Sequence, residues 1–244
     1  LLLGEVETKD DPNRVASALD KGLPASDAVM AIVDDGKVVE YCSDWAKDVV
    51  CALASVNGIA VGVVATDSSV GKGYISLDGA RKIAAFVDKL EAYDMPLITL
   101  VDSLGFNTTV EQEKAGAAKV AAELFAAIAS SSIDKIGVAT GKAVGAAYSA
   151  LMSKGIGFDY TLATDKACVS PIAPDAAVDV LMADQLSAEK GKDLSKARAK
   201  LADSYAKLAA DPMIAAQEGY VDNVVEAKNL RPYIASALLM LKGI

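Results

Sequence analysis

The sequence contains no histidine, the side chain that most often moves protons in enzymes near neutral pH. Its three cysteines, Cys42, Cys51 and Cys168, form no CxxC pair. Without histidine and without paired cysteines, a zinc or iron–sulfur site is not expected. Any chemistry of this chain must therefore rest on backbone dipoles, on carboxylates or on a cofactor that another component supplies.

Long apolar runs and clustered positive charge are also missing. No apolar stretch approaches the roughly 18–20 residues of a transmembrane helix, which predicts a soluble protein. The net charge of −9 argues against nucleic acid as a partner, because phosphate binding requires clustered positive charge. The odd number of cysteines, with no secretion signal in view, predicts a cytoplasmic location.

The composition favours a layered α/β protein. Hydrophobic residues make up 52% of the 244 positions, whereas aromatic residues make up only 5%. Small apolar side chains of this kind suit the close packing of helices on a sheet. The mean hydropathy of +0.30 is high for a soluble monomer. It predicts that a partner covers some apolar surface, and in a homo-oligomer this partner is a second copy of the chain.

The beginning of the chain differs from the rest. Residues 1–25 are acidic and are interrupted by Pro12 and Pro24, which predicts a linker or tail. Residues 26–244 have regular apolar patterns and form the second predicted unit.

These patterns predict the elements of the second unit. Asn57-Gly58 is the strongest two-residue signal for a β-hairpin and joins the apolar runs 49–56 and 59–66. Further strands are expected at 37–41, 97–101, 135–139, 160–164 and 168–170. Helices are expected at about 76–93, 109–130, 175–182, 188–210 and 230–241, with a short piece near 214. Because strands and helices alternate through the middle of the chain, the sheet should be mainly parallel with right-handed crossovers.

A run of small residues, Gly145-Ala146-Ala147, follows the strand expected at 135–139 and begins a helix. Small residues let a ligand approach the backbone, and the first N–H groups of a helix have no internal partners. Two such N–H groups aimed at one point form an oxyanion hole, which requires no particular side chain. A tight packing junction between strand and helix is the alternative explanation for the same residues.

Several segments carry a resemblance that covers the chain from about residue 26 to its end. They are residues 61–65, 78, 81–82, 95–102, 105–106, 112–113, 142–148, 153–154, 215–216 and 219–222. Together they resemble the C-terminal half of the carboxyltransferase subunit of biotin-dependent acyl-CoA carboxylases and of sodium-pump decarboxylases. The spacing holds without gaps from about residue 48 to residue 154.

The resemblance implies a fold and a place in an assembly. The implied fold is the crotonase (ClpP-like) superhelix of ββα units, with a mainly parallel sheet and flanking helices. Only one domain of that size fits within 244 residues, and residues 1–25 resemble the linker that joins two such domains. In the family, the catalytic site lies where one subunit's N-terminal domain meets another subunit's C-terminal domain. The chain thus resembles the biotin-side half.

The resemblance also implies a reaction and site residues. A carboxyl group moves between carboxybiotin and the α carbon of an acyl-CoA through an enolate. By resemblance, the backbone N–H groups of Ala146 and Ala147 face the ureido oxyanion of biotin. The other biotin-side residues are Gly105, Phe106, Gly145 and Tyr148. An ordinary turn with a core aromatic is the alternative explanation for Gly105-Phe106. Biotin would arrive on a carrier protein or domain, and the reaction would need no metal. The further partners would be the N-terminal half and either a biotin carboxylase or a membrane decarboxylase subunit.

The sequence departs from the family pattern at several positions. Ala146 stands where relatives usually have glycine, which keeps the N–H but narrows the approach. Ser149 stands where propionyl-CoA carboxylases have an aspartate linked to acyl preference. Leu104 replaces a proline, and Gly141 replaces a basic residue. Because of these changes, the sequence does not identify the acyl group of the substrate. It does not identify the direction of the reaction either.

Two other functions are compatible with the sequence. A stand-alone enoyl-CoA hydratase or isomerase of the crotonase type would need paired carboxylates over the acyl chain, and Glu111, Glu113 and Glu123 are the candidates. The first two equally suit the positive end of a helix dipole. A non-catalytic oligomerisation domain is the second alternative.

Two further groups of residues have a structural and a functional explanation. The lysines 192, 196, 200 and 207 predict a solvated helix face, with contact to a CoA phosphate as the alternative. Trp45 and Tyr148 are expected to be packed or interfacial, with a functional role as the alternative. Asp222 is expected to close the end of the sheet.

Overall fold

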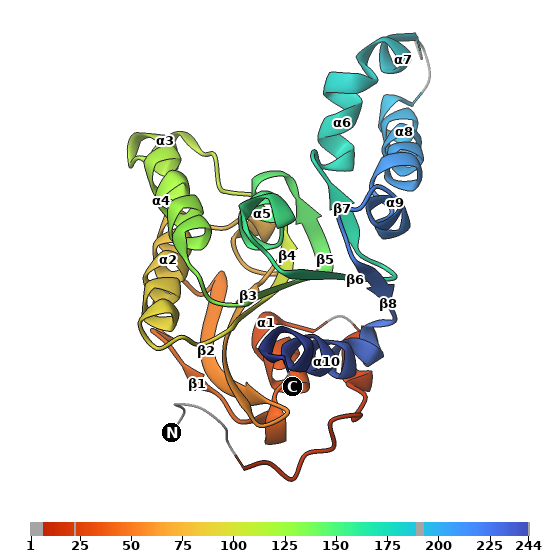
Figure 1. The fold of residues 1–244 in the computed structure, drawn as a ribbon. Coiled ribbons are helices and arrows are strands. Elements are labelled where there is room, and N and C mark those ends of the chain that lie inside the picture. The colour runs from red at the N-terminus through yellow and green to blue at the C-terminus, as the bar shows by residue number, and fades with distance from the viewer. Residues whose placement is uncertain (1–6, 22, 189–192, 244) are drawn as a thin grey trace.

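The sheet is the centre of the molecule (Figure 1). The computed structural model describes residues 7–21, 23–188 and 193–243. Within these ranges, the sheet has eight strands in the order β1-β2-β3-β4-β5-β6-β8, and β7 pairs with the end of β5. The strands are β1 (Val39–Glu40), β2 (Val49–Val56), β3 (Ile59–Thr66), β4 (Leu97–Ser103), β5 (Lys135–Val144), β6 (Tyr160–Thr164), β7 (Cys168–Ser170) and β8 (Asn223–Val225). Pairing is antiparallel up to β3 and parallel beyond it, so the predicted mainly parallel sheet is confirmed.

The hairpin between β2 and β3 forms where the sequence predicts it. Asn57 and Gly58 have φ angles of 52° and 74°, and two positive φ angles are the requirement of a type I′ turn. Val56 and Ile59 are paired directly next to the turn. The turn residues therefore fix the register of the whole hairpin.

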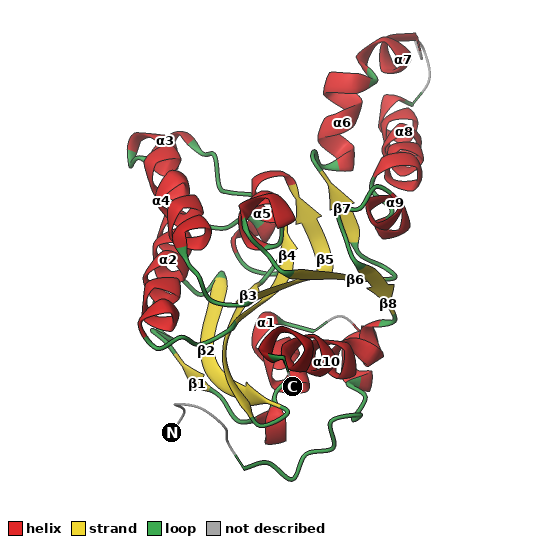
Figure 2. Ribbon diagram, in the orientation of Figure 1, coloured by secondary structure: helices red, strands yellow, loops and turns green. Residues whose placement is uncertain are grey.

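Helices cover both faces of the sheet (Figure 2). They are α1 (Ala25–Ile32), α2 (Leu77–Ala92), α3 (Val110–Lys114), α4 (Ala117–Ser130), α5 (Gly145–Leu151), α6 (Pro174–Leu181), α7 (Ala183–Ala188), α8 (Leu194–Ala209), α9 (Pro212–Gln217) and α10 (Leu230–Lys242). Buried side chains of α2, α4 and α5 form one cluster with the sheet, and those of α1 and α10 form another on the opposite face. Within the described ranges, no helix combines the length and apolar character needed to cross a bilayer.

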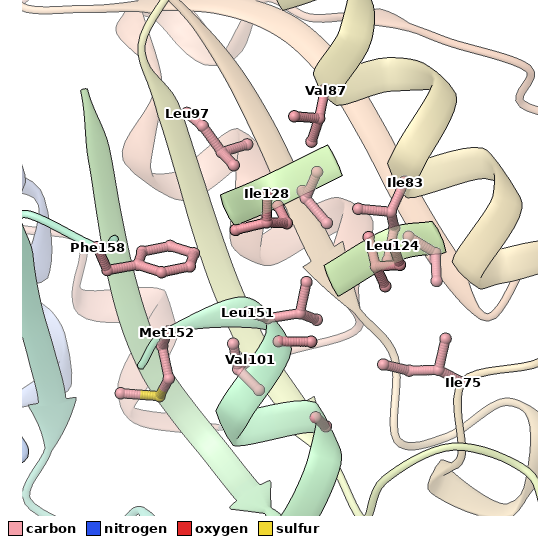
Figure 3. Close-up of a cluster of buried hydrophobic side chains, with 14 of the residues drawn as sticks. Ile75, Ile83, Val87, Leu97, Val101, Leu124, Ile128, Leu151, Met152 and Phe158 are labelled. Atoms are coloured by element: carbon pink, nitrogen blue, oxygen red, sulfur yellow. The ribbon is translucent and has the colours of Figure 1, made fainter. Parts of the chain in front are cut away.

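Side chains of four elements meet in the first cluster, and they fix the position of α5 (Figure 3). Leu97 of β4, Val87 of α2, Ile128 of α4 and Leu151 of α5 are all buried there. The residues after α5 approach the β5 backbone so closely that a Cβ at Gly137 would lie 2.5 Å from the Cβ of Met152. Helix α5 is thus held directly against the strand from which it emerges.

A pair of helices, α6 and α8, projects from the edge of the sheet (Figure 1). Two nitrogens of Arg198 donate to the two carboxylate oxygens of Asp179, at 2.6 and 2.5 Å. The hydrogen bonds from Arg198 hold the pKa of Asp179 below its usual range. This bidentate pair joins the two helices.

Several predicted elements have different bounds in the structure. The helix expected at 109–130 is broken into α3 and α4 at Gly116, whose φ of +90° a right-handed helix does not allow. The strand expected at 135–139 continues to Val144, so the Gly141–Val144 stretch is strand rather than loop. The helix expected at 188–210 corresponds to α8, and residues 189–192 lie outside the described ranges.

The described part of the predicted linker is in contact with the core. Ala16 and Leu19 are buried with the α1–α10 cluster. Arg14 donates to both carboxylate oxygens of Asp10, at 2.7 and 2.9 Å, and to two main-chain carbonyls. The division of the chain at residue 25 stays a prediction, but the segment before it does not lie apart from the domain.

Candidate functional site

The carboxyl ends of β4 and β5 bring two of the predicted site segments together. Ser103 is paired with Ala143, so the loops that follow the two strands emerge side by side. In the first loop, Gly105 has a φ of +127°, and a Cβ there would lie 4.0 Å from the carbonyl oxygen of Val144. Phe106 comes next in the chain and packs against the core cluster.

Hydrogen bonds to a neighbouring segment fix the conformation of that loop. The Ile75 N–H donates to the Gly105 carbonyl, and the Asn107 N–H donates to the Ile75 carbonyl. The Ser103 hydroxyl donates to the Gly73 and Gly105 carbonyls, at 3.0 and 3.1 Å. The loop is therefore held on both sides before any ligand binds.

Helix α5 begins without a capping side chain. Its N-cap residue is Val144, which offers no side-chain acceptor, and Gly145 comes next with a φ of +55°. Among the described residues, the structure gives no hydrogen-bond partner to the N–H groups of Ala146 and Ala147. Unpaired N–H groups at a helix start are a site for negative charge. That the two N–H groups form an oxyanion hole stays a prediction.

A pocket of about 570 Å³ opens at the start of α5. Its lining residues are Phe125, Gly145, Ala146, Tyr148, Ser149, Val169, Ser170, Pro171, Ala209, Ile214, Ala215, Glu218 and Tyr220. Four elements contribute most of it, namely α4, α5, β7 and α9. Most of the lining is apolar, and the polar groups are few, as is usual in pockets that bind small ligands.

Two polar side chains of α5 line the pocket, and the hydroxyl group of each makes a hydrogen bond to a main-chain carbonyl. The Tyr148 hydroxyl donates to the carbonyl of Tyr220 at 3.4 Å, and burial raises its pKa. The Ser149 hydroxyl donates to the Gly145 carbonyl at 3.2 Å, one helical turn back. Because this proton is already used, Ser149 presents only acceptor lone pairs to the pocket.

The structure brings some predicted site residues together and leaves others apart. Gly145, Ala146, Tyr148 and Ser149 line one pocket. The side chain of Ala147 is fully buried beneath the same helical turn. Gly105 and Phe106 lie on the neighbouring loop and are not part of the lining.

Sequence reasoning missed the wall opposite α5. Phe125, Pro171, Ile214 and Glu218 come from segments that are distant along the chain, and none belongs to a recognisable motif. Tyr220 could have been identified from the sequence, since it lies in one of the segments that carry the family resemblance. The apolar character of α9 alone does not tell a pocket wall from a core face.

The three carboxylates considered for a hydratase-type reaction do not line this pocket. Glu111 and Glu113 lie on α3 and are exposed, and Glu123 pairs with Lys119 on the surface of α4. None of the three lines the pocket, where Glu218 is the carboxylate among the lining residues. Within the described residues, no group of three or more histidine, cysteine or acidic residues is arranged to hold a metal.

The lysines of α8 behave as a solvated face. Lys196 pairs with Asp193 at 3.4 Å, and Lys207 pairs with Asp203 at 2.7 Å, all within one exposed surface. Lys192 lies outside the described residues. Such exposed pairs contribute little to stability.

Asp222 has the structural role that the sequence predicts. It accepts hydrogen bonds from Lys154 and from both the N–H and the hydroxyl of Thr161. Burial raises its pKa, but these hydrogen bonds outweigh burial and hold the pKa below its usual range. Asp222 thereby ties the start of β6 to the segment before β8.

Comparison with known proteins agrees with this architecture. The sequence model of the carboxyl transferase domain family matches residues 5–243. The chain therefore belongs to the carboxyl transferase domain family, and the predicted resemblance is confirmed.

Two curated relatives show the extent of the match. The chain is 32% identical over 234 residues to the methylmalonyl-CoA decarboxylase subunit alpha of Propionigenium modestum, covering 96% of this chain and 44% of that protein. It is 34% identical over 217 residues to the propionyl-CoA carboxylase beta chain of Saccharopolyspora erythraea, covering 88% of this chain and 40% of that protein. The chain thus spans less than half the length of these relatives.

The crystal structure of transcarboxylase 12S, solved with hydrolysed methylmalonyl-coenzyme A bound, has the same fold. The two superimpose with a TM-score of 0.89 at 29% identity, over 100% of this chain and 48% of that one. This likeness confirms the predicted crotonase-type fold. Transcarboxylase 12S itself assembles as a hexamer.

Proposed function

We propose that this chain is the biotin-side half of the carboxyltransferase of a biotin-dependent acyl-CoA carboxylase or decarboxylase. The observation that carries the proposal is the pocket at the start of α5, where the N–H groups of Ala146 and Ala147 have no partner in the described chain. Family membership supports it, because the relatives are named as carboxylase and decarboxylase subunits.

The pocket suits the bicyclic head of biotin. Its volume of about 570 Å³ accommodates a small ring system, its walls are mostly apolar, and Gly145 and Ala146 at the start of α5 are part of its lining. When bound, biotin supplies the carrier for the carboxyl group. The residues of this chain would bind and orient the ring, and they would exclude water from it.

The free N–H groups supply the electrostatic part of the reaction. In the proposed site, the N–H groups of Ala146 and Ala147 donate to an oxygen on which negative charge develops. Two fixed donors stabilise such a charge, since they are already oriented when it develops. A chain without histidine can perform this function, because the donors are backbone groups.

The remaining pocket residues have distinct proposed roles. Tyr148 lies beside the donors and closes the pocket against Tyr220. Ser149 lies one residue further along α5, and we assign it an influence on acyl preference, with its acceptor lone pairs facing the substrate. Gly105 and Phe106 complete the biotin side from the neighbouring loop, whose carbonyl-bonded conformation holds them in place.

The second half of the site is proposed to come from an N-terminal half of the carboxyltransferase. Because the chain spans less than half of its relatives, the acyl-CoA would be bound by a complementary N-terminal half. Biotin would arrive on a carrier protein, and the complete enzyme would also contain a biotin carboxylase or a membrane decarboxylase subunit. A homo-oligomeric core fits the exposed apolar side chains of the projecting helices, among them Val180, Leu181 and Leu208.

The test is carboxyl transfer to biotin from malonyl-CoA or methylmalonyl-CoA. It is run with this chain alone, with its complementary half alone and with both. We expect transfer only in the mixture. Turnover of an enoyl-CoA by this chain without biotin would instead identify a stand-alone crotonase enzyme. Assembly with the complementary half but no transfer from any CoA ester would identify a non-catalytic oligomerisation domain.

A further inference from the structure

Strands β4 and β5 lose their regular pairing just before the proposed site. Val101 is paired with Ala139, and the next pair is Ser103 with Ala143. From the first of these pairs to the second, β4 advances by two residues and β5 advances by four, so β5 contains a bulge. Bulges of this kind bend a strand and redirect the residues after it, and they are common next to active sites.

Asp102 is the β4 residue that lies opposite this bulge. Its Oδ1 accepts a hydrogen bond from the N–H of Lys142 at 2.8 Å, and its Oδ2 accepts one from the hydroxyl of Ser68 at 2.5 Å. Its own N–H donates to the hydroxyl of Thr66 at 2.7 Å. The carboxylate thus accepts from the Lys142 N–H at the break in the β4–β5 ladder, where Lys142 has no pairing partner on β4; Lys142 pairs with Cys168 of β7 on its other side.

Gly141 lies against the same carboxylate. A Cβ at residue 141 would collide with the Asp102 carboxyl group. The φ of Gly141 is not positive, unlike that of Gly145. Glycine at 141 therefore permits the close approach of Asp102, because a side chain at this position would displace the carboxylate from its place beside the β5 backbone.

Only a few residues separate the bulge from the proposed donors. Lys142 is followed by Ala143 and Val144, which pair with Val169 and Ser170 of β7, and α5 then begins at Gly145. No flexible loop separates the bulge from the helix. The backbone from Lys142 to the first turn of α5 is thus continuous paired strand followed directly by helix.

We propose that Asp102 is a positioning residue, whose carboxylate fixes the β5 bulge and thereby aims the N–H groups at the start of α5. The inference rests on the proposed function of those N–H groups. Asp102 itself is not among the residues that line the pocket. It acts through the backbone of β5.

The chain contains a matched control for this bond. At the opposite end of β5, the N–H of Lys135 donates to Asp159 Oδ2, also at 2.8 Å. Both aspartates therefore hold a β5 N–H with a carboxylate oxygen at the same distance. Of the two, Asp102 is the one close to the start of α5.

The experiment compares Asp102→Ala, Asp102→Asn and Gly141→Ala with Asp159→Ala. Backbone hydrogen exchange is measured for peptides that cover residues 138–152, on this chain by itself. Carboxyl transfer is measured with the complementary half. We expect Asp102→Ala to speed exchange at 142–144 by about tenfold and to lower kcat by about 10²-fold, with KM for the CoA ester nearly unchanged.

The other variants separate positioning from a general loss of stability. Gly141→Ala should reproduce the effect from the opposite side, by pushing the carboxylate away. Asp102→Asn should recover part of kcat, because its amide oxygen can still accept from Lys142. Asp159→Ala should leave exchange at 142–144 and kcat close to those of the wild type, even where its melting temperature falls as far as that of Asp102→Ala.

Equal exchange at 142–144 in Asp102→Ala and Asp159→Ala would overturn the inference. So would a kcat that falls only in proportion to the folded fraction. Absence of transfer by the wild type with every CoA ester contradicts the proposed function instead, and the exchange measurement then still decides whether Asp102 fixes the bulge.

Discussion

At the residue scale, the proposed catalytic groups are backbone hydrogens, so most side-chain substitutions leave them in place. Ala146 is exposed and is the second residue of α5, where an N–H has no intrahelical acceptor. Proline is tolerated in the first turn of a helix because the N–H that it removes is unpaired there. A proline can therefore remove one donor with little effect on the fold.

We expect Ala146→Pro to lower kcat for carboxyl transfer by about 10²- to 10³-fold, the usual effect of removing one oxyanion-hole donor. Steady-state kinetics in the reconstituted mixture would measure it. Ala118→Pro is the control, because Ala118 is also the second residue of its helix, α4. Equal kcat values for the two variants would exclude an oxyanion role for the Ala146 N–H.

The site residues that sequence reasoning found share a local signature. Gly145, Ala146 and Tyr148 lie close together along the chain, and a strand that enters a helix through small residues is visible in the sequence. Asp102 and Gly141 carry no such signature, because their contact depends on the register between two strands. No local pattern records which residue of β4 faces which residue of β5.

At the element scale, hydrophobic period and turn chemistry predicted most strands and helices. Asn57-Gly58 specifies its own turn, so β2 and β3 were predicted to their ends. The continuation of β5 through Gly141 and Lys142 was not predicted, since small and polar residues there resemble a loop. Their strand geometry depends on Asp102 and on pairing with β7, which are tertiary contacts.

A second carboxylate joins elements at the opposite end of the sheet. Glu91, in the last turn of α2, accepts hydrogen bonds from the hydroxyl of Ser131 and from both the N–H and the hydroxyl of Ser132. These bonds, first among them that from Ser131, lower its pKa from 4.5 to about 2. The contact connects α2 with the turn between α4 and β5.

We expect this contact to give an acid-dependent stability. Because the folded-state pKa is lowered, the stabilisation is fully present above the unfolded value of 4.5 and is lost as pH falls through about 2. The difference in melting temperature between wild type and Glu91→Gln should thus be constant above about pH 5 and shrink between pH 4.5 and 2. Glu123→Gln, which alters an exposed surface pair, should show no such trend; a difference for Glu91→Gln that stays constant down to pH 2 would contradict the assignment.

At the scale of the whole molecule, a buried ion cluster connects parts of the chain that are far apart in sequence. Arg231, near the start of α10, is fully buried and donates to Asp34 at 2.7 Å and to the carbonyl of Asp11. Asp34 also accepts the N–H groups of Asn57 and Gly58 in the hairpin turn. The cluster therefore joins the beginning of the chain, the hairpin and the last helix.

The same cluster includes Asp10, whose carboxylate lies 3.3 Å from Arg231. The hydrogen bond from Arg14, together with the other groups around it, holds the pKa of Asp10 below its usual range. The sequence shows an acidic, proline-interrupted beginning, which is typical of a linker. It does not show the buried arginine that these acidic residues face, because Arg231 is more than 200 residues away.

We expect Arg231→Met to lower the free energy of unfolding by about 3–5 kcal/mol, since it leaves the buried carboxylate of Asp34 without its cation. Urea denaturation would measure this, in a double-mutant cycle with Asp34→Asn. The double variant should be more stable than the sum of the single effects predicts, because the orphaned charge is gone. Arg81→Met, which breaks an exposed pair with Asp78, should cost less than about 1 kcal/mol. A cost for Arg231→Met no larger than that of Arg81→Met, or strictly additive effects in the cycle, would show that the cluster does not hold the ends of the chain to the sheet.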